Sequence, residues 1–545
     1  WSGCAARISA RKRWRRVSAL ASGPKTSAGV PARFFRTDDA AGAASFTDLT
    51  NAGSVNYCTA QCWYDNYVVT PAGSPDTVFL GGSHQYGEIY GVSNGRGLVM
   101  STDAGATFTD MTVEYGDGTS SINLHPDHHA LTVVPSNPNI FFSGSDGGLV
   151  RSSGRFVNNS AACAARGLTG ANLANCQQLL SKIPERLFSL NKGLSTLQFQ
   201  SVLTNPQNPS LLIGGTQDNG TWLSNGSVQN WSQTIYGDGG QSGFDVANPA
   251  FRFNTFFTQA VDANFQNGDP TKWVVISGPL FNSGETAPFY MAIIGDPKVG
   301  GTMFAGLQSV YRTTDNGGNQ AYLEANCSEF TTSAAAPDCG DWQRLSGSNL
   351  TTSALGDRSG GTVAAVERTA SDTGTLWAAT STGRVFISKN ADAATASSVS
   401  FTRLDSLAAN DPGRFVSSIF VDPANANHAW ISYSGYNFNT PAQPGHVFSV
   451  TYDPAAGTAT WANLDAGTGP MGDLPVTDLV QDSATGDLYA ATDFGVLRLP
   501  SGTSSWVAAG SGLPMVEVPG LTIVPGSRIL YAATHGRSSW QIKLP

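Results

Sequence analysis

The sequence predicts an all-β fold built from repeated four-stranded sheets, and three observations carry that prediction. One unit recurs nine times: an apolar strand, a turn with Pro, Asn or Gly, and a second apolar strand that ends in Gly, Thr or a small polar residue. Within the units, apolar residues alternate with a period of two, and β-branched and aromatic residues are frequent, which is typical of strands. Turn-forming residues are abundant, with 61 Gly and 28 Pro among 545 residues.

The spacing of these units predicts how the sheets are assembled. They begin at Tyr67, Ala130, Ser201, Gly243, Met291, Val363, Ser418, Asp478 and Leu521. One four-stranded blade of a β-propeller needs roughly 40–50 residues, so the units leave room for insertions. A single sheet cannot bury both faces alone, whereas a ring lets each sheet cover its neighbours. We therefore predict a β-propeller, a single ring of about 8–10 blades with nine the expected number; two smaller propellers are the alternative.

The two ends of the chain suggest how the ring closes. The last unit supplies strands around Leu521, Ile529 and Trp540 but lacks an outer strand, and residues 45–49 form an isolated strand pattern. We expect these two ends to pair. One helix is expected, at about residues 172–183 in an insertion at 155–195, and Pro184 should end it. The expected domains are a basic segment at 1–36, either a leader or a flexible arm, and a propeller at 37–545.

Charge and hydropathy limit the possible partners. Residues 1–36 carry nine Lys or Arg and no acidic residue, so the rest of the chain has 22 basic and 40 acidic residues, a net charge of −18. A body this acidic repels nucleic acid, and no nucleic-acid partner is expected. No apolar run approaches the roughly 18 residues of a membrane span. The expected oligomeric state stays open.

Six of the seven cysteines form three local pairs inside loops rich in Gly, Ala and Ser. The expected disulfides are Cys58–Cys62, Cys163–Cys176 and Cys327–Cys339, with Cys4 left over. Zinc is the alternative, but no CxxC or nearby Cys/His quartet supports it. Because disulfides persist in oxidising compartments, we expect a secreted or cell-surface protein, with no metal and no cofactor.

A second signature occurs in the polar hairpins. Residues 101–108 read Ser-Thr-Asp-Ala-Gly-Ala-Thr-Phe and match the Asp-box pattern S-x-D-x-G-x-T-[FW], with partial copies around Asp315, Asp38 and Asn390. We expect the carboxylate of Asp103 to accept hydrogen bonds from N–H groups of its turn, Gly105 to adopt a positive φ, and Phe108 to pack between sheets. This motif indicates a fold rather than a chemistry.

With these motifs, residues 36–545 resemble the bacterial neuraminidase repeat (Asp-box) superfamily of propellers. That superfamily includes sialidases, xyloglucan hydrolases, sortilin-type receptors and many secreted bacterial proteins, and the last group is the most similar. The resemblance rests on five strings at 125–131, 144–148, 214–221, 237–240 and 534–537. It implies a bacterial, extracellular protein whose ligand is a polysaccharide or a cell-surface glycan or protein.

These strings carry the candidate site residues, because they fall at strand ends, where propeller loops surround the central channel. Asp146 resembles the first catalytic aspartate of xyloglucan hydrolases and Asp238 loosely resembles the second, although the two lie only 92 residues apart. Two carboxyl groups are what glycoside hydrolysis requires. Asp146 and Asp238 are therefore the candidate catalytic residues, and the candidate ligand-binding residues are His125, Asp127, His129, Gln217, Asp218, Asp493, His535 and Arg537.

Two classes of function remain open from the sequence. The first is a secreted glycoside hydrolase that acts through Asp residues at the channel mouth. The second is a non-catalytic binding or structural propeller, in which the same Asp and His side chains hydrogen-bond turns and neighbouring blades. A sialidase is disfavoured, because there is no Arg-Ile-Pro string and no clear set of three arginines. We expect Asp146, Gln217, Asp218 and Asp238 to converge near His125 and His129.

Overall fold

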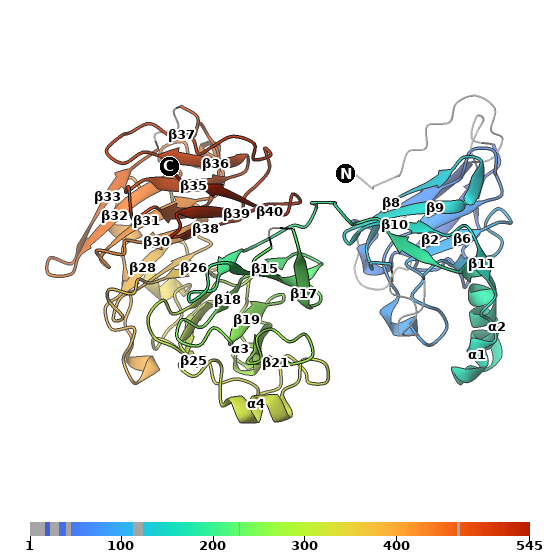
Figure 1. The fold of residues 1–545 in the computed structure, drawn as a ribbon, viewed down its shortest axis with the longest axis horizontal. Helices are drawn as coiled ribbons and strands as arrows, with labels where there is room; N and C mark the ends of the chain where they lie inside the picture. The colour runs from blue at the N-terminus through green and yellow to red at the C-terminus, as the bar shows by residue number, and fades with distance from the viewer. Residues whose placement is uncertain (1–16, 22–31, 40–44, 113–123, 228, 466–468) are drawn as a thin grey trace. The chain divides into compact units, whose positions relative to one another are not determined.

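The computed structural model describes residues 17–21, 32–39, 45–112, 124–227, 229–465 and 469–545. These residues form antiparallel sheets arranged in two compact units, residues 1–194 (unit 1) and 195–545 (unit 2). Figure 1 labels their strands and helices. The all-β prediction is confirmed, and each of the nine repeated units of the sequence begins the first strand of a separate sheet or lies next to it.

Unit 1 contains three successive sheets and a two-stranded ribbon among its described residues. The first sheet joins β1 (Val17–Ala21), β2 (Arg33–Thr37) and β3 (Thr47–Asp48). The second joins β4 (Tyr67–Val69), β5 (Val78–Gly81), β6 (Leu98–Ser101) and β7 (Thr109–Asp110). The third joins β8 (His128–Val134), β9 (Asn137–Ser145), β10 (Gly148–Ser152) and β13 (Leu187–Ser189).

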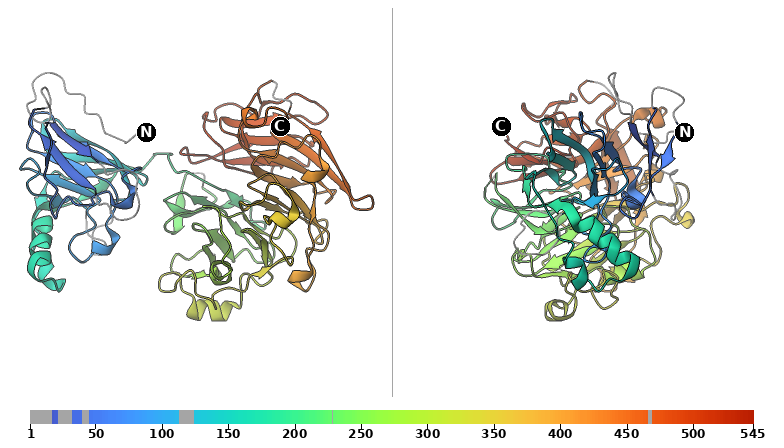
Figure 2. Two further views of the ribbon diagram at one scale, coloured as in Figure 1. Left: turned by 180° about the vertical axis from the view of Figure 1, so that it is seen from behind. Right: turned by 90° about the vertical axis from the view of Figure 1, so that its right-hand side faces the viewer.

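The insertion lies between the third and fourth strands of that last sheet. It holds β11 (Phe156–Val157), α1 (Ala162–Ala165), α2 (Gly170–Leu179) and β12 (Ile183–Pro184), and Figure 2 shows its helices projecting from the sheets of unit 1. The helix expected at about 172–183 is α2, which ends earlier because a 3-10 turn (Leu180–Lys182) leads into the β12 strand. Arg166 holds the insertion to the β5–β6 loop through the carbonyl oxygens of Gly91 and Ser93.

Unit 2 contains seven successive sheets, and its described residues account for seven of the nine repeats. The first three sheets are β14 (Leu203–Thr204), β15 (Leu211–Thr216), β16 (Gly220–Asn225) and β17 (Trp231–Ile235); β18 (Ser242–Phe244), β19 (Arg252–Thr255), β20 (Val261–Asn264) and β21 (Trp273–Val275); and β22 (Ile293–Gly295), β23 (Met303–Gly306), β24 (Val310–Thr313) and β25 (Gln343–Arg344). Two short helices, α3 (Gly278–Asn282) and α4 (Gln320–Asn326), lie in the connections.

The remaining four sheets complete unit 2. They are β26 (Val363–Glu367), β27 (Leu376–Thr380), β28 (Val385–Ser388) and β29 (Thr402–Arg403); β30 (Val416–Val421), β31 (His428–Tyr433), β32 (Val447–Asp453) and β33 (Thr458–Asn463); β34 (Val476–Gln481), β35 (Leu488–Thr492), β36 (Gly495–Leu499) and β37 (Val507–Ala508); and β38 (Gly520–Val524), β39 (Ile529–Ala533) and β40 (Ser539–Lys543).

The first strands of these seven sheets contact one another in sequence, and β38 of the last sheet contacts β14 of the first. Thr522 donates to the carbonyl oxygen of Val202, and the backbone N–H of Ser538 donates to Leu197. Buried Phe199, Leu212 and Tyr531 pack together across this junction. Unit 2 is therefore a closed seven-bladed propeller, and its core lies between neighbouring sheets. The propeller fold is confirmed, but the expected single ring of about nine blades is wrong, because the ring closes within unit 2 after seven sheets.

One detail of the closure expected from the sequence is corrected. The strand at residues 45–49 does not complete the last sheet, since β3 pairs with β2 through Phe35 opposite Asp48. A partner only about ten residues away costs less chain entropy than one at the far end of the sequence. Residues 197–202 close unit 2 in its place.

The structure contains the disulfides Cys58–Cys62, Cys163–Cys176 and Cys327–Cys339, the three pairs suggested by spacing. In the described part of the chain, every helix is too short or too polar to cross a bilayer. Cys4 and the run of basic residues at 11–16 lie outside the described residues, so the boundary expected at residue 36 stays a prediction.

Candidate functional site

Strand order explains why the candidate residues gather at one end of their sheets. In a four-stranded antiparallel sheet, the entry to the first strand, the turn between the second and third strands and the exit from the fourth all lie at the same end. His125 and Asp127 precede β8, Asp146 lies between β9 and β10, and Asp238 follows β17. The turns at 217–218, 493 and 535–537 occupy the same position in their own sheets.

The Asp-box hairpins lie at the opposite end, between the third and fourth strands. Asp103 sits between β6 and β7, where its carboxylate accepts from the backbone N–H and the hydroxyl of Thr107, at 2.9 and 2.6 Å. Gly105 has φ +91, and Phe108 is buried against Phe34. Each feature matches its expected structural role. Asp315 occupies the equivalent hairpin between β24 and β25.

The candidate residues separate into two groups, one in each unit. His125, Asp127, His129 and Asp146 belong to unit 1, whereas Gln217, Asp218, Asp238, Asp493, His535 and Arg537 belong to unit 2. The proposed convergence of Asp146 with Asp238 therefore stays a prediction, and each group is described by itself.

Asp146 is the centre of the first group. The Tyr64 hydroxyl donates to its Oδ2 at 2.9 Å, and His129 Nε2 lies 2.7 Å from its Oδ1. The rings of Tyr64 and His129 meet edge to face with centroids 4.7 Å apart. The three side chains remain accessible to solvent, with 17% of the Asp146 side chain exposed. This carboxylate can therefore meet a ligand.

Asp127 stands near a second carboxyl group that the sequence analysis did not select. Gln61 Nε2 donates to Asp127 Oδ1 at 2.8 Å. Asp65 is completely buried, and neither of its carboxyl oxygens has a well-formed hydrogen bond within the described residues. An ionised carboxylate in such a place is costly. Burial, and then the charge of Asp127, raises the pKa of Asp65 to about 8, which identifies it as the protonated partner of the two.

A positional signal in the sequence could have found Asp65. It stands just before β4, as Asp127 stands just before β8, so both mark the entry to the first strand of a sheet. Asp65, Asp127 and Asp146 form what we call the carboxyl cluster of unit 1, because the charges of the latter two both act on Asp65.

Two buried histidines lie behind this cluster. His84 and His128 are fully enclosed, with ring centroids 6.0 Å apart, and His128 Nδ1 lies 3.0 Å from the Ser143 hydroxyl. Burial lowers the pKa of His84 to about 3 and that of His128 well below its ordinary value, so both rings are neutral. Gly97 leaves the space that these rings fill, since a Cβ there would meet both of them.

Metal binding was the alternative chemistry for the His-Asp-His string. Within the described ranges, no group of three or more His, Cys, Asp or Glu side chains has an arrangement suited to a metal ion. His125 Nδ1 accepts from the Asp127 backbone N–H at 3.3 Å, a contact within its own turn.

The second group lies in unit 2 around Asp238. Its Oδ1 accepts from the Tyr290 hydroxyl at 3.1 Å and from the Asp218 backbone N–H at 3.2 Å. Burial and the Asp238 charge raise the pKa of Tyr290, so that its hydroxyl stays a donor. Gln217 accepts from Gln198 Nε2 at 2.7 Å. In these contacts, Asp218 and Gln217 act mainly to join adjacent turns.

Asp493 lies two blades away from the Asp238 blade around the ring, whereas His535 and Arg537 lie in the blade next to it, all at the same end of their sheets. The Tyr436 hydroxyl lies 3.5 Å from Asp493 Oδ2, and burial raises the pKa of that carboxyl. His535 Nδ1 lies 3.0 Å from Glu517 Oε2, and the carbonyl oxygen of Arg537 accepts from the Trp540 indole. Asp493 with Tyr436 and His535 with Glu517 therefore form two further local contacts at this end of unit 2.

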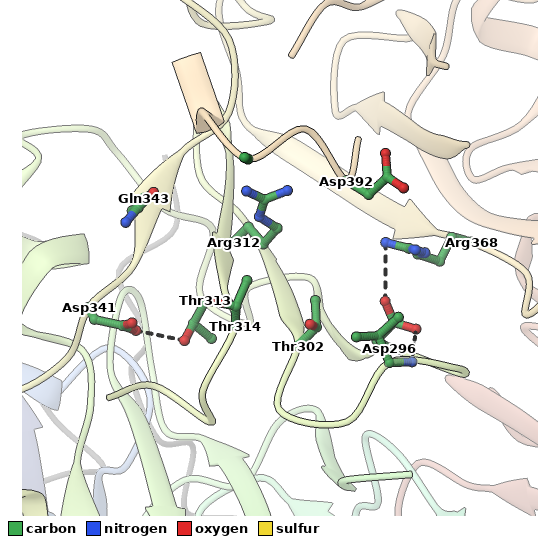
Figure 3. Close-up of a pocket in the computed structure, with 11 residues that line it drawn as sticks. Asp296, Thr302, Arg312, Thr313, Thr314, Asp341, Gln343, Arg368 and Asp392 are labelled. Atoms are coloured by element: carbon green, nitrogen blue, oxygen red, sulfur yellow. Dashed lines mark hydrogen bonds and ion pairs between the residues drawn. The ribbon is translucent and has the colours of Figure 1, made fainter. Parts of the chain in front are cut away.

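A pocket of about 320 Å³ lies near the Asp-box hairpin end of unit 2 and is lined by none of the candidate residues (Figure 3). Arg368 pairs with Asp296 at 3.1 Å inside it, both side chains being buried. Arg312 donates to the carbonyl oxygens of Ala391 and Ala393. Because these contacts join the β22–β25 and β26–β29 sheets, we interpret the pocket as part of a blade junction.

Neither a protein-family model nor a curated protein matches the sequence. Among solved structures, a GH74 enzyme of Niastella koreensis has a TM-score of 0.50 and 14% identity, over 97% of this chain and 65% of that chain. The β-propeller domain of Cps50 (Swd1) from Myceliophteria thermophila has a TM-score of 0.43 and 12% identity, over 64% of this chain and 97% of that chain. YCF48 from Cyanidioschyzon merolae has a TM-score of 0.44 and 11% identity, over 65% of this chain and 96% of that chain. The likeness to the GH74 enzyme shows a shared propeller fold, and this chain spans 65% of that enzyme's length.

Proposed function

We propose that this protein is a secreted bacterial Asp-box propeller that hydrolyses glycosidic bonds of an extracellular polysaccharide at the carboxyl cluster of unit 1. The observation that carries the proposal is the pairing of a protonated, buried carboxyl with accessible carboxylates. Asp65 holds its proton beside Asp127, and Asp146 is oriented by Tyr64 and His129. Glycoside hydrolysis needs one carboxyl group that gives a proton and another that acts as base or nucleophile.

The roles follow from these contacts. Asp65 is too buried to reach a substrate, so it acts as a positioning residue that supplies the proton of the pair. Asp127 would take this proton from Asp65 and give it to the leaving oxygen, and Asp65, left ionised, would take a proton back from solvent through Asp127. Asp146, with Tyr64 and His129 on its two oxygens, would act as base or nucleophile.

Aromatic side chains around the cluster favour a carbohydrate as substrate. Trp63, Tyr64, Tyr86 and Tyr90 are exposed, and the Trp63 and Tyr64 rings lie 5.5 Å apart. The exposed rings offer apolar faces to the C–H faces of sugars, and the nearby carboxylates accept hydrogen bonds from sugar hydroxyl groups. The three disulfides fit an oxidising compartment and support secretion.

The test is release of reducing ends from a panel of polysaccharides. Asp146→Asn and Asp127→Asn should each lower kcat by about 10²–10⁴-fold, since each removes one proton-transfer group. Asp315→Asn is the matched control, because this residue also accepts from a hydroxyl group but lies in an Asp-box hairpin, at the opposite end of its sheet. Asp238→Asn tests the other catalytic candidate. A loss confined to Asp238→Asn would contradict the assignment.

A non-catalytic glycan-binding propeller is the second candidate. It is favoured by the contacts of Asp146, whose two oxygens are both engaged by Tyr64 and His129. Wild-type protein that binds a polysaccharide and releases no reducing ends from it would support this candidate instead.

A further inference from the structure

Six aromatic rings follow one another in contact at the Asp238 side of unit 2. We call them the aromatic row: Phe330, Tyr236, Phe256, Phe257, Phe289 and Tyr290. Consecutive centroids are 6.2, 6.4, 5.0, 6.3 and 4.9 Å apart. Four of the rings, Phe330, Tyr236, Phe257 and Phe289, are 41–51% exposed. A contiguous exposed apolar surface of this kind marks an interaction site.

The row is built into the fold rather than left on a loose loop. A Cβ on Gly237 would lie within the Phe256 ring, and one on Gly240 would meet the Tyr290 ring. The glycines of the Gly-Asp-Gly-Gly turn therefore make the room in which these two rings pack. The backbone N–H of Thr258 donates to the carbonyl oxygen of Phe289 at 2.8 Å and joins the two loops that carry Phe257 and Phe289.

Carboxyl groups stand at both ends of the row. At one end, the Tyr236 hydroxyl donates to Glu329 Oε1 at 3.2 Å, and Glu329 in turn hydrogen-bonds with buried Asp262. At the other end, the Tyr290 hydroxyl donates to Asp238. These bonds fix the orientation of the two tyrosine rings of the row before any ligand arrives.

We propose that the aromatic row is a second carbohydrate-binding surface, distinct from the carboxyl cluster of unit 1, and that it takes a neutral polysaccharide. The proposal rests on the proposed function only in its choice of ligand class. The Phe257 and Phe289 rings, with planes 26° apart and centroids 6.3 Å apart, offer stacking faces to neighbouring sugar units, whereas Tyr236 and Tyr290 stand nearly perpendicular to Phe256 and Phe289. Acceptors at both ends suit hydroxyl donors, and the acidic chain, with net charge −9, disfavours acidic glycans.

The experiment is affinity electrophoresis of the full chain in gels that contain a β-glucan, a mannan, a dextran or, as the acidic probe, polygalacturonate. The Asp146→Asn background prevents hydrolysis during the run. We expect retardation by at least one neutral polymer and none by polygalacturonate. The double variant Phe257→Ala/Phe289→Ala should raise the dissociation constant at least about tenfold, because it removes two stacking faces.

Two further variants keep the result interpretable. Phe438→Ala is the matched control, since Phe438 is 87% exposed in the β31–β32 loop, outside the row. Phe289→Trp keeps a ring at its position and should retain binding, which distinguishes lost stacking from a disturbed fold. Unchanged retardation of the double variant, retardation by polygalacturonate alone, or no retardation of the parent by any neutral polymer would each overturn the proposal.

The outcome separates this proposal from the hydrolase. One possible result is that protein with Asp146 intact releases no reducing ends, while the double variant loses its retardation. This result would support the aromatic row and reject hydrolysis. Release of reducing ends with undiminished retardation of the double variant would do the reverse.

Discussion

Asp103 and Asp65 lie at opposite ends of the β4–β7 sheet of unit 1. Their surroundings shift the pKa values of the two carboxyl groups in opposite directions. Asp103 lies in a hairpin where N–H and hydroxyl donors surround its carboxylate, and hydrogen bonds from Thr107 and Ser101 lower its pKa against the opposing effect of burial. Asp65 lies among buried groups beside Asp127, and its pKa is raised to about 8. Local hydrogen bonding makes the first a structural anion, whereas tertiary packing makes the second a proton donor.

The largest expected effect tests the hairpin end. Gly105→Ala should destabilise the protein by about 2–5 kcal/mol, since its φ of +91 is strained for alanine and the new methyl group would meet the Phe34 ring. Urea unfolding at pH 7 measures the change. Gly73→Ala is the control, because φ is +85 there and no atom lies within 4 Å of the added carbon. An equal loss in both variants would show that the Phe34 contact contributes nothing.

A smaller effect is expected from the disulfide beside the carboxyl cluster. Removing it with Cys58→Ser/Cys62→Ser should cost about 2 kcal/mol, because it closes a loop of only four residues. The loop contains Gln61, which holds Asp127. The temperature of thermal unfolding and the hydrolysis rate should therefore both fall, whereas Cys163→Ser/Cys176→Ser, in the insertion, should leave the hydrolysis rate unchanged. Intact activity without Cys58–Cys62 would separate the disulfide from the cluster.

The features that the sequence predicts are those that depend on local interactions, and the features that it misses depend on tertiary contacts. The repeats and the Asp-box turn depend on neighbours within about ten residues, so the strand units and the roles of Asp103, Gly105 and Phe108 are predictable. Ring closure by residues 197–202 and the proton that Asp65 holds beside Asp127 depend on contacts across sheets. Strand position marks Asp65 as the entry to its sheet, but a single sequence does not show which side chains meet across sheets. The repeats alone therefore predict one ring of about nine blades, whereas seven of them close a ring in unit 2.

A modest effect is expected from Asp103→Ala, about 1–2 kcal/mol at pH 7, because the turn loses a capping carboxylate. The pKa of Asp103 is lowered in the folded state, so its contribution is present above the unfolded pKa near 3.8 and is lost as pH falls through the folded value. The stability difference between wild type and variant should thus shrink below about pH 4. A difference that stays constant down to pH 2 would contradict this assignment.

The smallest effect at pH 5, and the most specific one, is expected from Asp65→Asn. A raised pKa means that the folded state binds a proton that the unfolded state releases. The contribution of Asp65 to stability is therefore fully present below about pH 3.8 and declines as pH rises towards about 8. The asparagine amide that replaces the carboxyl group has nearly the same shape but does not titrate. Wild type and variant should have similar free energies of unfolding near pH 4, and the variant should become the more stable as pH approaches 8.

Urea titrations across this range measure the free energy of unfolding of both proteins. Asp127→Asn leaves Asp65 buried without its charged neighbour, so this variant should lower the pH dependence only in part. Parallel curves for wild type and Asp65→Asn would mean that Asp65 is not the protonated group of the carboxyl cluster.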